Sequence, residues 1–256
     1  MPYVDLDESN IADQHICCAF GDPKHEQGVL EKKKWLKRRF AEGLVFRKLD
    51  VRGKVFIEYM PSELAWRPIE APGFLTVHCL WVSGRYAKHG HGRALLRSCI
   101  DDARRQGKHG VVIASAKKKK AFLADPKFLE HLGFKCVDER AGFRLYACFL
   151  HGVPEASWPK FSPARKPRTR QPNAVQIYHS PQCPFNTHWV PLVAQEVEHA
   201  GFDVSIKRLT RAAQNRKVRS PLGAFSLESD EQLVAHCINA LGVTRKQLAG
   251  LRATSA

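Results

Sequence analysis

The sequence predicts an α/β protein with two domains, and three observations support this fold class. The chain has 256 residues, which is more than one compact core usually needs. A strand at 74–82, a glycine-containing turn, a helix at 92–106 and a strand at 110–114 make the unit typical of a right-handed crossover. A basic, proline-rich segment at 153–173 then precedes a further series of strands and helices.

The elements before this segment follow from the spacing of apolar residues. An amphipathic helix is expected at 31–42, and alternating apolar residues predict a hairpin of strands at 44–49 and 54–60. The strand at 74–82 is apolar almost throughout, which predicts burial on both faces of a sheet. A short helix and two strands complete this mixed-sheet domain, at 125–131, 135–138 and 143–149.

Prolines alternate with basic residues in the segment 153–173, so we expect a stiff linker between a domain at 1–152 and a domain at 174–256. The second domain is expected to be a small α/β domain. Its predicted strand, helix, strand, hairpin and closing helix lie at 174–178, 185–200, 203–209, 223–227 with 232–237, and 243–251.

The composition is that of a folded, basic protein. Apolar residues make up 44% of the chain, unlike the polar makeup of disordered sequences. The formal net charge of +16 would attract a phosphate-rich partner, which could be a cofactor, RNA or DNA. Much of this charge is equally consistent with ordinary solvated surface, for example in the lysine runs at 32–34 and 117–120.

Signals for export or membrane insertion are not recognisable in the sequence. The first residues lack the basic start and apolar stretch of a secretory signal, and no apolar run reaches the roughly 18 residues of a membrane span. The eight cysteines form no CxxC pair, which favours free thiols in a reducing cytoplasm. We expect a cytoplasmic protein with no metal site.

The helix at 92–106 opens on a turn that is suited to phosphate. A helix N-terminus has unpaired backbone N–H groups and about half a positive charge, so it binds phosphate where the chain can come close. Gly90 and Gly92 permit that approach because they have no side chain. The residues expected to bind the phosphates are Arg85, Lys88, His89, Gly90, His91, Gly92 and Arg93.

This turn resembles the pyrophosphate loop of the Gcn5-related N-acetyltransferases. In that family the loop has Gln or Arg, two residues, Gly, one residue, Gly or Ala, and usually a Leu-Leu pair. Ala87 stands where the family has Gln or Arg, and Lys88 stands where many members have another glycine. The late Gly-Phe signature of the family is similar to 132–134. The loop positions that match are Gly90, Gly92, Leu95 and Leu96.

A closer resemblance is to the uncharacterised bacterial acetyltransferases of the YoaP type. It rests on HICC at 15–18, GKVFIEY at 53–59, AWRP at 65–68 and CLWVSG at 79–84, and PQCPF at 181–185 extends it past the linker. The resemblance implies an enzyme that transfers an acetyl or other acyl group from coenzyme A to an amine of a small molecule or peptide. The expected cofactor is therefore acetyl-CoA or another acyl-CoA.

The family resemblance also implies where the donor lies. The strand that ends at Val82 would splay from its neighbour, and the backbone groups of Leu80, Trp81 and Val82 would pair with the pantetheine arm. Many family members protonate the leaving thiolate with a tyrosine, whose place is taken here by Leu129. The general acid is therefore unassigned.

The attacking amine must lose a proton, and a buried carboxylate or histidine is the usual base. Glu58 is the first candidate because its strand is otherwise apolar; an edge carboxylate paired with a basic neighbour is the alternative. His78 and Cys79 lie on the strand that leads to the cofactor, but only one of them can face the acyl group in a regular strand. Cys79 is also consistent with an unreactive core thiol.

The second domain resembles a thioredoxin-like fold in its order of elements. The stretch Cys183-Pro184-Phe185-Asn186 is similar to a glutaredoxin active site in which Asn186 replaces the second cysteine. A helix start favours the thiolate of Cys183, which predicts a redox or thiol-binding role; a structural or recognition role is the alternative. The resemblance also implies a cis peptide bond before Pro221.

Two other functions stay open at this point. An aminoacyl-tRNA donor in place of coenzyme A would suit the departures at Ala87 and Lys88 and the basic segments. A non-catalytic adaptor for RNA or thiols would also use the positive charge, although the sequence has no aromatic-rich RNA-binding motif.

Overall fold

The computed structural model describes residues 2–16, 19–120, 122–165, 173–229, 232–237 and 241–253. The chain divides into two compact units, and each unit is described by itself. Unit 1 consists of Met1–Phe20, Lys33–Ala65 and Ile69–Phe161. Unit 2 consists of Gly21–Lys32, Trp66–Pro68 and Ser162–Ala256. Two short segments from the first half of the chain thus belong to unit 2, which the sequence did not predict.

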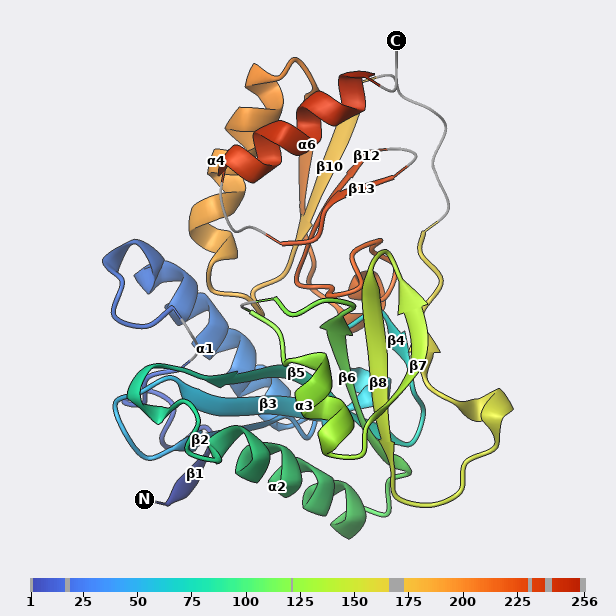
Figure 1. Ribbon diagram of the computed structural model, residues 1–256. Helices are drawn as coiled ribbons and strands as arrows, with labels where there is room; N and C mark the ends of the chain where they lie inside the picture. Colours follow the sequence, from blue (N-terminus) through green and yellow to red (C-terminus); the bar gives the residue numbers. More distant parts are fainter. Residues whose placement is uncertain are drawn as a thin grey trace. The chain divides into compact units, whose positions relative to one another are not determined.

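The described part of unit 1 contains a seven-stranded sheet with the order β1-β2-β3-β5-β6-β8-β7 (Figure 1). The pair β5–β6 is parallel and the other neighbouring pairs are antiparallel, so the sheet is mixed as predicted. The strands are β1 (Tyr3–Leu6), β2 (Val45–Leu49), β3 (Val55–Pro61), β5 (Phe74–Val82), β6 (Gly110–Ala116), β7 (Lys135–Arg140) and β8 (Phe143–Phe149).

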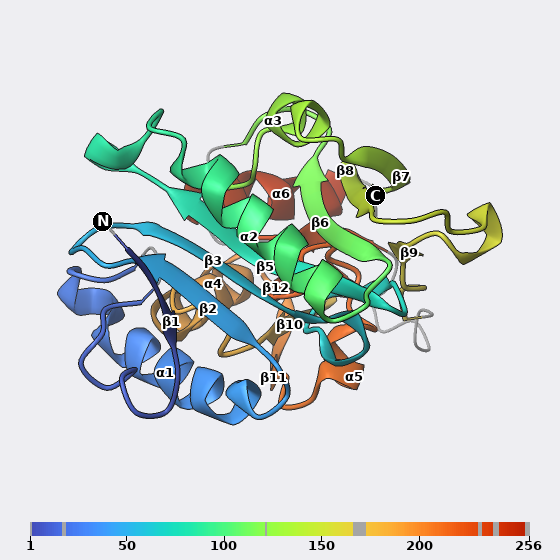
Figure 2. The ribbon, with the colours of Figure 1, turned by 90° about the horizontal axis from the view of Figure 1, so that it is seen from below.

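Helix α2 (His91–Arg105) crosses one face of this sheet (Figure 2). Its inward residues recur at helical spacing and are buried against strand residues such as Leu75 and Val77. Helix α3 (Pro126–His131) adds Leu129 to the same core. The inward residues of α2 are Leu95, Leu96, Cys99, Ile100 and Ala103.

Part of the expected linker is folded into unit 1. Strand β9 (Lys160–Phe161) pairs with β4 (Ile69–Glu70), and the ring of Trp158 lies 5.2 Å from that of Phe149. The linker residues 166–172 lie outside the described residues. The side chain of Phe161 is buried in this packing. Removing its apolar surface from water stabilises the folded position of this segment.

Unit 2 has a four-stranded sheet in its described part, with the order β11-β10-β12-β13. Strand β10 pairs with β11 in parallel and with β12 antiparallel, and β12–β13 form the predicted hairpin. The strands are β10 (Ala174–His179), β11 (Asp203–Arg208), β12 (Phe225–Ser229) and β13 (Leu233–Ala235). The helices are α4 (Asn186–His199), α5 (Ala212–Asn215) and α6 (Leu241–Ala253). One core, which includes Val193, Leu227 and Leu248, lies between the sheet and the helices α4 and α6.

The expected cis bond before Pro221 is wrong, because none of the described peptide bonds is cis. The N–H of Gly223 donates to the carbonyl of Ser220 at 3.1 Å, which closes a β-turn with Pro221 at its second position. A trans proline suits that position, whereas a cis proline belongs at the third position of a turn. In the described part of the chain no helix is long and apolar enough to cross a membrane.

Candidate active site

The two parallel strands of unit 1 separate where the resemblance implied that they would. The residues Phe74–Val77 of β5 pair with Gly110–Ile113 of β6, but β5 continues to Val82 without further pairing to β6 in these fully described strands. Strand β6 instead keeps its pairing with β8 as far as Ala116. The backbone groups of Leu80, Trp81 and Val82 on the β6 side of β5 are thus available to another partner.

Helix α2 begins just beyond the end of β5, at the turn that the sequence singled out. Gly90 is the N-cap and has a φ of +79°, a left-handed conformation that glycine adopts without steric cost. The first helical hydrogen bond runs from Ala94 N–H to Gly90 C=O at 3.0 Å. The N–H groups of His91, Gly92 and Arg93 therefore precede the helical ladder and point out of the helix end.

The two glycines of the turn have different surroundings. A Cβ on Gly90 would meet no atom within 4 Å, so this residue borders open space. A Cβ on Gly92 would lie 3.6 Å from Phe128 and 3.8 Å from Val82, which is ordinary contact. Gly92 therefore faces the gap between the end of β5 and helix α3, whereas the backbone angle is what requires glycine at position 90.

The histidine side chains of the turn already have partners. His91 Nδ1 lies 2.8 Å from the hydroxyl of Tyr3, and His89 Nδ1 lies 2.8 Å from the carbonyl of Ala87. Recognition of a phosphate at these two positions would therefore depend on backbone N–H groups. The basic side chains Arg85, Lys88 and Arg93 are exposed around the same turn.

The candidate base Glu58 lies beside His78. Glu58 Oε1 and His78 Nδ1 are 3.2 Å apart, and both side chains have 0% exposure. One partner of Glu58 is thus a buried histidine on the adjacent strand, and β3 is an inner strand of the sheet. The ring of Trp35 on α1 (Glu26–Phe40) lies 6.3 Å from that of His78.

His78 is the extra residue of a β-bulge. Tyr59 pairs with Val77 and Glu58 pairs with Cys79, so no residue of β3 is opposite His78. The bulge shifts the alternation of β5 by one residue: Val77 before it and Leu80 after it both pack in the core under α2. His78 and Cys79 therefore share the opposite face, together with Glu58. The expectation that only one of them can face the acyl group was made for a regular strand, and the bulge removes that restriction.

The expected place of the general acid is buried, since Leu129 has 0% exposure within the core. The hydroxyl of Tyr146 on β8 donates to Glu130 at 3.2 Å, and burial raises the pKa of this tyrosine. Tyr146 belongs to the core cluster under α2 and α3, so it does not replace the missing tyrosine.

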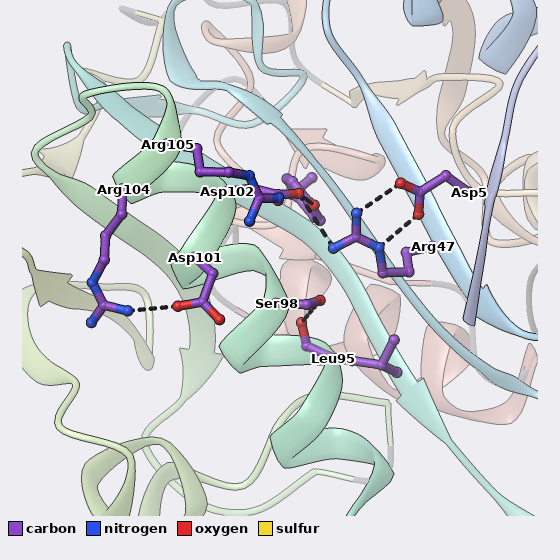
Figure 3. Close-up of polar contacts among 9 residues, drawn as sticks. Asp5, Arg47, Leu95, Ser98, Asp101, Asp102, Arg104 and Arg105 are labelled. Atoms are coloured by element: carbon purple, nitrogen blue, oxygen red, sulfur yellow. Dashed lines mark hydrogen bonds and ion pairs between the residues drawn. The ribbon is translucent and has the colours of Figure 1, made fainter. Parts of the chain in front are cut away.

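Sequence reasoning missed a charged cluster that fixes α2 to the sheet (Figure 3). Arg47 on β2 donates to both carboxylate oxygens of Asp5, at 2.6 and 2.7 Å, and lies 3.3 Å from Asp102 of α2. Asp102 also accepts from the hydroxyl of Tyr59 and from Arg105. Burial raises the pKa of Tyr59, which keeps its hydroxyl a donor. The sequence offered one signal for this cluster: the acidic residue Asp102 lies next to Ala103, which is buried on the inward side of α2.

Cys183 lies in the turn before α4 and is half-buried. Burial raises the pKa of its thiol, against the opposing effects of the Phe185 N–H and the Lys32 charge. This direction is opposite to the expected favoured thiolate, because the loss of hydration outweighs the donors at the helix start. Asn186, which replaces the second cysteine, donates to the carbonyls of Ser180 and Ala224 at 2.9 and 2.8 Å.

Residues 11–134 of the chain match the model of the acetyltransferase (GNAT) family. Over 249 residues the chain is 39% identical to the uncharacterized N-acetyltransferase YoaP of Bacillus subtilis, which covers 97% of this chain and 98% of that relative. Solved structures with lower similarity include PaiA N-acetyltransferase from Thermoplasma acidophilum in complex with coenzyme A, with 14% identity, a TM-score of 0.38 and coverage of 51% of this chain and 80% of that one. A GNAT family acetyltransferase from Brucella melitensis in complex with acetyl-CoA has 19% identity, a TM-score of 0.34 and coverage of 54% and 75%.

A mixed sheet in which β5 and β6 separate, followed by a glycine turn and a helix, is the arrangement that the resemblance to the acetyltransferases implied. The match over nearly the whole length of a named N-acetyltransferase shows that the protein belongs to the acetyltransferase (GNAT) family. Acetyl-CoA is the acyl donor of that family, as the resemblance of the turn implied.

Proposed function

We propose that the protein transfers an acetyl group from acetyl-CoA to an amine of a small molecule or peptide. The observation that carries this proposal is that β5 leaves β6 after Val77 and is followed directly by the helix that opens at Gly90. A long donor with phosphates at one end and a thioester at the other fits this arrangement. Its phosphates would meet the helix end and its pantetheine arm would lie along Leu80, Trp81 and Val82.

The chemistry of the turn suits the pyrophosphate of the donor. The N–H groups of His91, Gly92 and Arg93 face out of the helix end, and the space beside Gly90 is open. These donors cooperate with the positive end of the helix dipole, which favours an anion. The exposed side chains of Arg85, Lys88 and Arg93 add positive charge around the same position.

Glu58 and His78 are the proposed proton-transfer pair for the amine acceptor. The carboxylate accepts from the imidazole and holds its orientation, which leaves the imidazole suited to receive a proton. Because neither side chain is exposed, the pair acts on the acceptor through an intervening group and does not touch it.

The test is calorimetric titration of acetyl-CoA into the full-length protein and into Gly92→Val. A Cβ at Gly92 would make only ordinary contacts with Phe128 and Val82, so we expect the fold to survive while the branched side chain stands where the pyrophosphate must approach. Binding is expected to weaken by more than about tenfold, equivalent to about 1.4 kcal/mol. Gly90→Val should weaken it as well but adds backbone strain, and Lys88→Ala is the milder control. Equal affinity in Gly92→Val and the parent would remove the turn from the site.

The full chain is the appropriate material for this titration. A fragment ending near His151 would lack β9, whose pairing with β4 belongs to unit 1. It would also interrupt unit 2, which includes the segment 21–32. Loss of binding in such a fragment would therefore report on folding as well as on the site.

We further propose a thioredoxin-like identity for unit 2. The parallel pair β10–β11 next to the antiparallel strands β12 and β13 supports it, as does the position of Cys183 between β10 and α4. The raised pKa of Cys183 and the structural hydrogen bonds of Asn186 favour a recognition role over dithiol exchange.

A tRNA-linked donor has less support than acetyl-CoA. In the lysine run 117–120, Lys117 lies 3.9 Å from Glu139 and Lys119 lies 3.5 Å from Asp125, so acidic side chains offset part of its charge. The ratio of absorbance at 260 and 280 nm of the purified protein tests this alternative, since bound nucleic acid would raise it.

A further inference from the structure

The acid–base pair of the proposed function has one half-exposed neighbour on its own side of the sheet. Glu58 and His78 have no exposed side-chain surface, so an acceptor amine cannot reach them directly. Cys79 follows His78 in the chain, carries a thiol and is half-buried. It is therefore the member of this cluster that a bound thioester can meet.

The bulge in β5 is what brings the three groups together. In a regular strand His78 and Cys79 would point to opposite faces. Here both residues stand against Glu58, and the core alternation resumes at Leu80, one residue later than a regular strand would place it. A nucleophile, a histidine and a carboxylate thus share one face of the sheet.

Cys79 also lies close to the point where β5 and β6 separate. The pairing of β5 with β6 ends at Val77, and Cys79 is the second residue beyond that point. The proposed pantetheine arm runs along Leu80 to Val82, so the thioester at the end of the arm would be next to Cys79. The imidazole of His78 and the acyl carbon would then lie near the same sulfur atom.

We infer that Cys79 is a covalent acyl carrier that takes the acetyl group before the amine does. This inference rests on the proposed function of acetyl transfer from acetyl-CoA. In the first step the Cys79 thiol gives its proton to His78 at Nε2, and the sulfur attacks the thioester carbonyl. A bond forms between Cys79 Sγ and the acyl carbon, the bond to the donor sulfur breaks, and the leaving thiolate takes a proton from water while His78 keeps the proton of Cys79.

The second step returns the enzyme to its starting state. The acceptor amine attacks the acetyl group on Cys79, and a bond from nitrogen to carbon forms while the bond from Cys79 Sγ to carbon breaks. The proton that His78 took from Cys79 returns to the cysteine sulfur, and the nitrogen gives up its extra proton to water. Both steps exchange one acyl bond for another, so no oxidant or reductant is needed. Glu58 stabilises the imidazolium in each step.

The inference can be tested without knowing the acceptor, because the first step needs only acetyl-CoA. Full-length protein is mixed with acetyl-CoA alone and quenched in acid, and its mass is measured intact and after digestion. One added acetyl group on the peptide that contains Cys79 is expected. Labelled coenzyme A should also exchange into acetyl-CoA in the absence of any amine, because the first step is reversible.

Matched variants separate Cys79 from other thiols. Cys79→Ala should lose the acetyl mark and reduce the exchange by about 10²-fold or more. Cys148→Ala is the control: Cys148 is also half-buried and free, but it packs against the core on the α2 side of the sheet. That variant should match the parent. His78→Gln should slow the exchange and change its pH profile while Cys79 can still be acetylated.

Failure of this inference is distinguishable from failure of the proposed function. If acetyl-CoA binds the parent and Cys79→Ala equally in calorimetry but the parent shows neither acetylation of Cys79 nor exchange, the covalent carrier is refuted and direct transfer to the amine stands. If acetyl-CoA does not bind the parent, the proposed function itself is refuted. An acetyl mark on another cysteine that persists in Cys79→Ala also overturns the assignment.

Discussion

At the scale of single residues, Lys88 shows how this chain retains a glycine-like turn without the glycine. Its φ is +66°, in the left-handed region that favours glycine, and many members of the family have a glycine at this place. A side chain in this conformation costs about 1–2 kcal/mol relative to glycine. The departure from the family pattern thus changes the side chain but not the path of the backbone.

Lys88→Gly is therefore expected to stabilise the protein by about 1 kcal/mol, because it relieves this backbone strain. Lys88→Ala is the control, since alanine keeps the Cβ and hence the strain. Urea denaturation of both variants measures the difference. Equal free energies of unfolding for the two variants would contradict the argument.

Cys183 gives a second prediction at this scale. Because burial raises the pKa of its thiol, Cys183 holds less thiolate at neutral pH than an ordinary cysteine, and its alkylation rate should keep rising above the usual thiol pKa of about 8.5. Partial loss of hydration also raises the pKa of the Cys136 thiol, but this residue is exposed to the reagent.

Brief treatment of the folded protein with iodoacetamide, followed by mass spectrometry, should therefore find Cys136 modified before Cys183. Fast labelling of Cys183 at neutral pH would show that the thiolate is favoured after all, and would restore a thiol-based role for unit 2.

At the scale of elements, the sequence predicts most of unit 1 because its strands and helices have clear apolar periods. Strand β5 and helix α2 lie within a residue or two of their expected bounds. The bulge at His78 could not be predicted, because it depends on the register between two strands that are distant in the chain. The short strands β4 and β9 could not be predicted, because a strand of two residues is too short to show alternation of apolar and polar residues.

The cluster around Asp102 determines how α2 is held on the sheet, and it gives a prediction for the element. Asp102→Asn removes the charge that faces Arg47 and Arg105, so a largely buried guanidinium loses a partner. We expect a loss of about 3 kcal/mol in the free energy of unfolding.

The adjacent Asp101→Asn is a matched control on the same helix. Asp101 pairs with Arg104 in an exposed i,i+3 bridge, which is worth at most about 0.5 kcal/mol. Similar losses in the two variants, measured by urea denaturation, would show that the Asp102 cluster does not hold the helix.

At the scale of the whole molecule, the division into units does not follow the order of the chain. The boundary after Phe161 falls within the proline-rich segment 153–173, but composition cannot reveal that 21–32 belongs to unit 2. That membership arises from close contacts with residues far along the chain. His25 packs its ring 4.6 Å from Phe185, and Glu31 bonds to Arg208 at 2.5 Å.

Gly28 shows how tight these contacts within unit 2 are. A Cβ at this position of α1 would lie 1.9 Å from the carbonyl oxygen of Pro184, just before α4. Glycine inside a helix normally costs about 1 kcal/mol relative to alanine, so the close approach of Pro184 explains why a glycine stands here.

Gly28→Ala is accordingly expected to destabilise unit 2 by about 1–3 kcal/mol, since the backbone at Pro184 must shift to admit the methyl group. Hydrogen exchange should show loss of protection in the amides of 180–199. Gly250→Ala in α6 is the control, because a Cβ there meets nothing within 4 Å. It should stabilise the protein by up to about 1 kcal/mol through helix propensity alone. If Gly28→Ala were as stabilising as Gly250→Ala, the segment 21–32 would not be packed into unit 2 as described, because a helical glycine without a close neighbour gains from alanine.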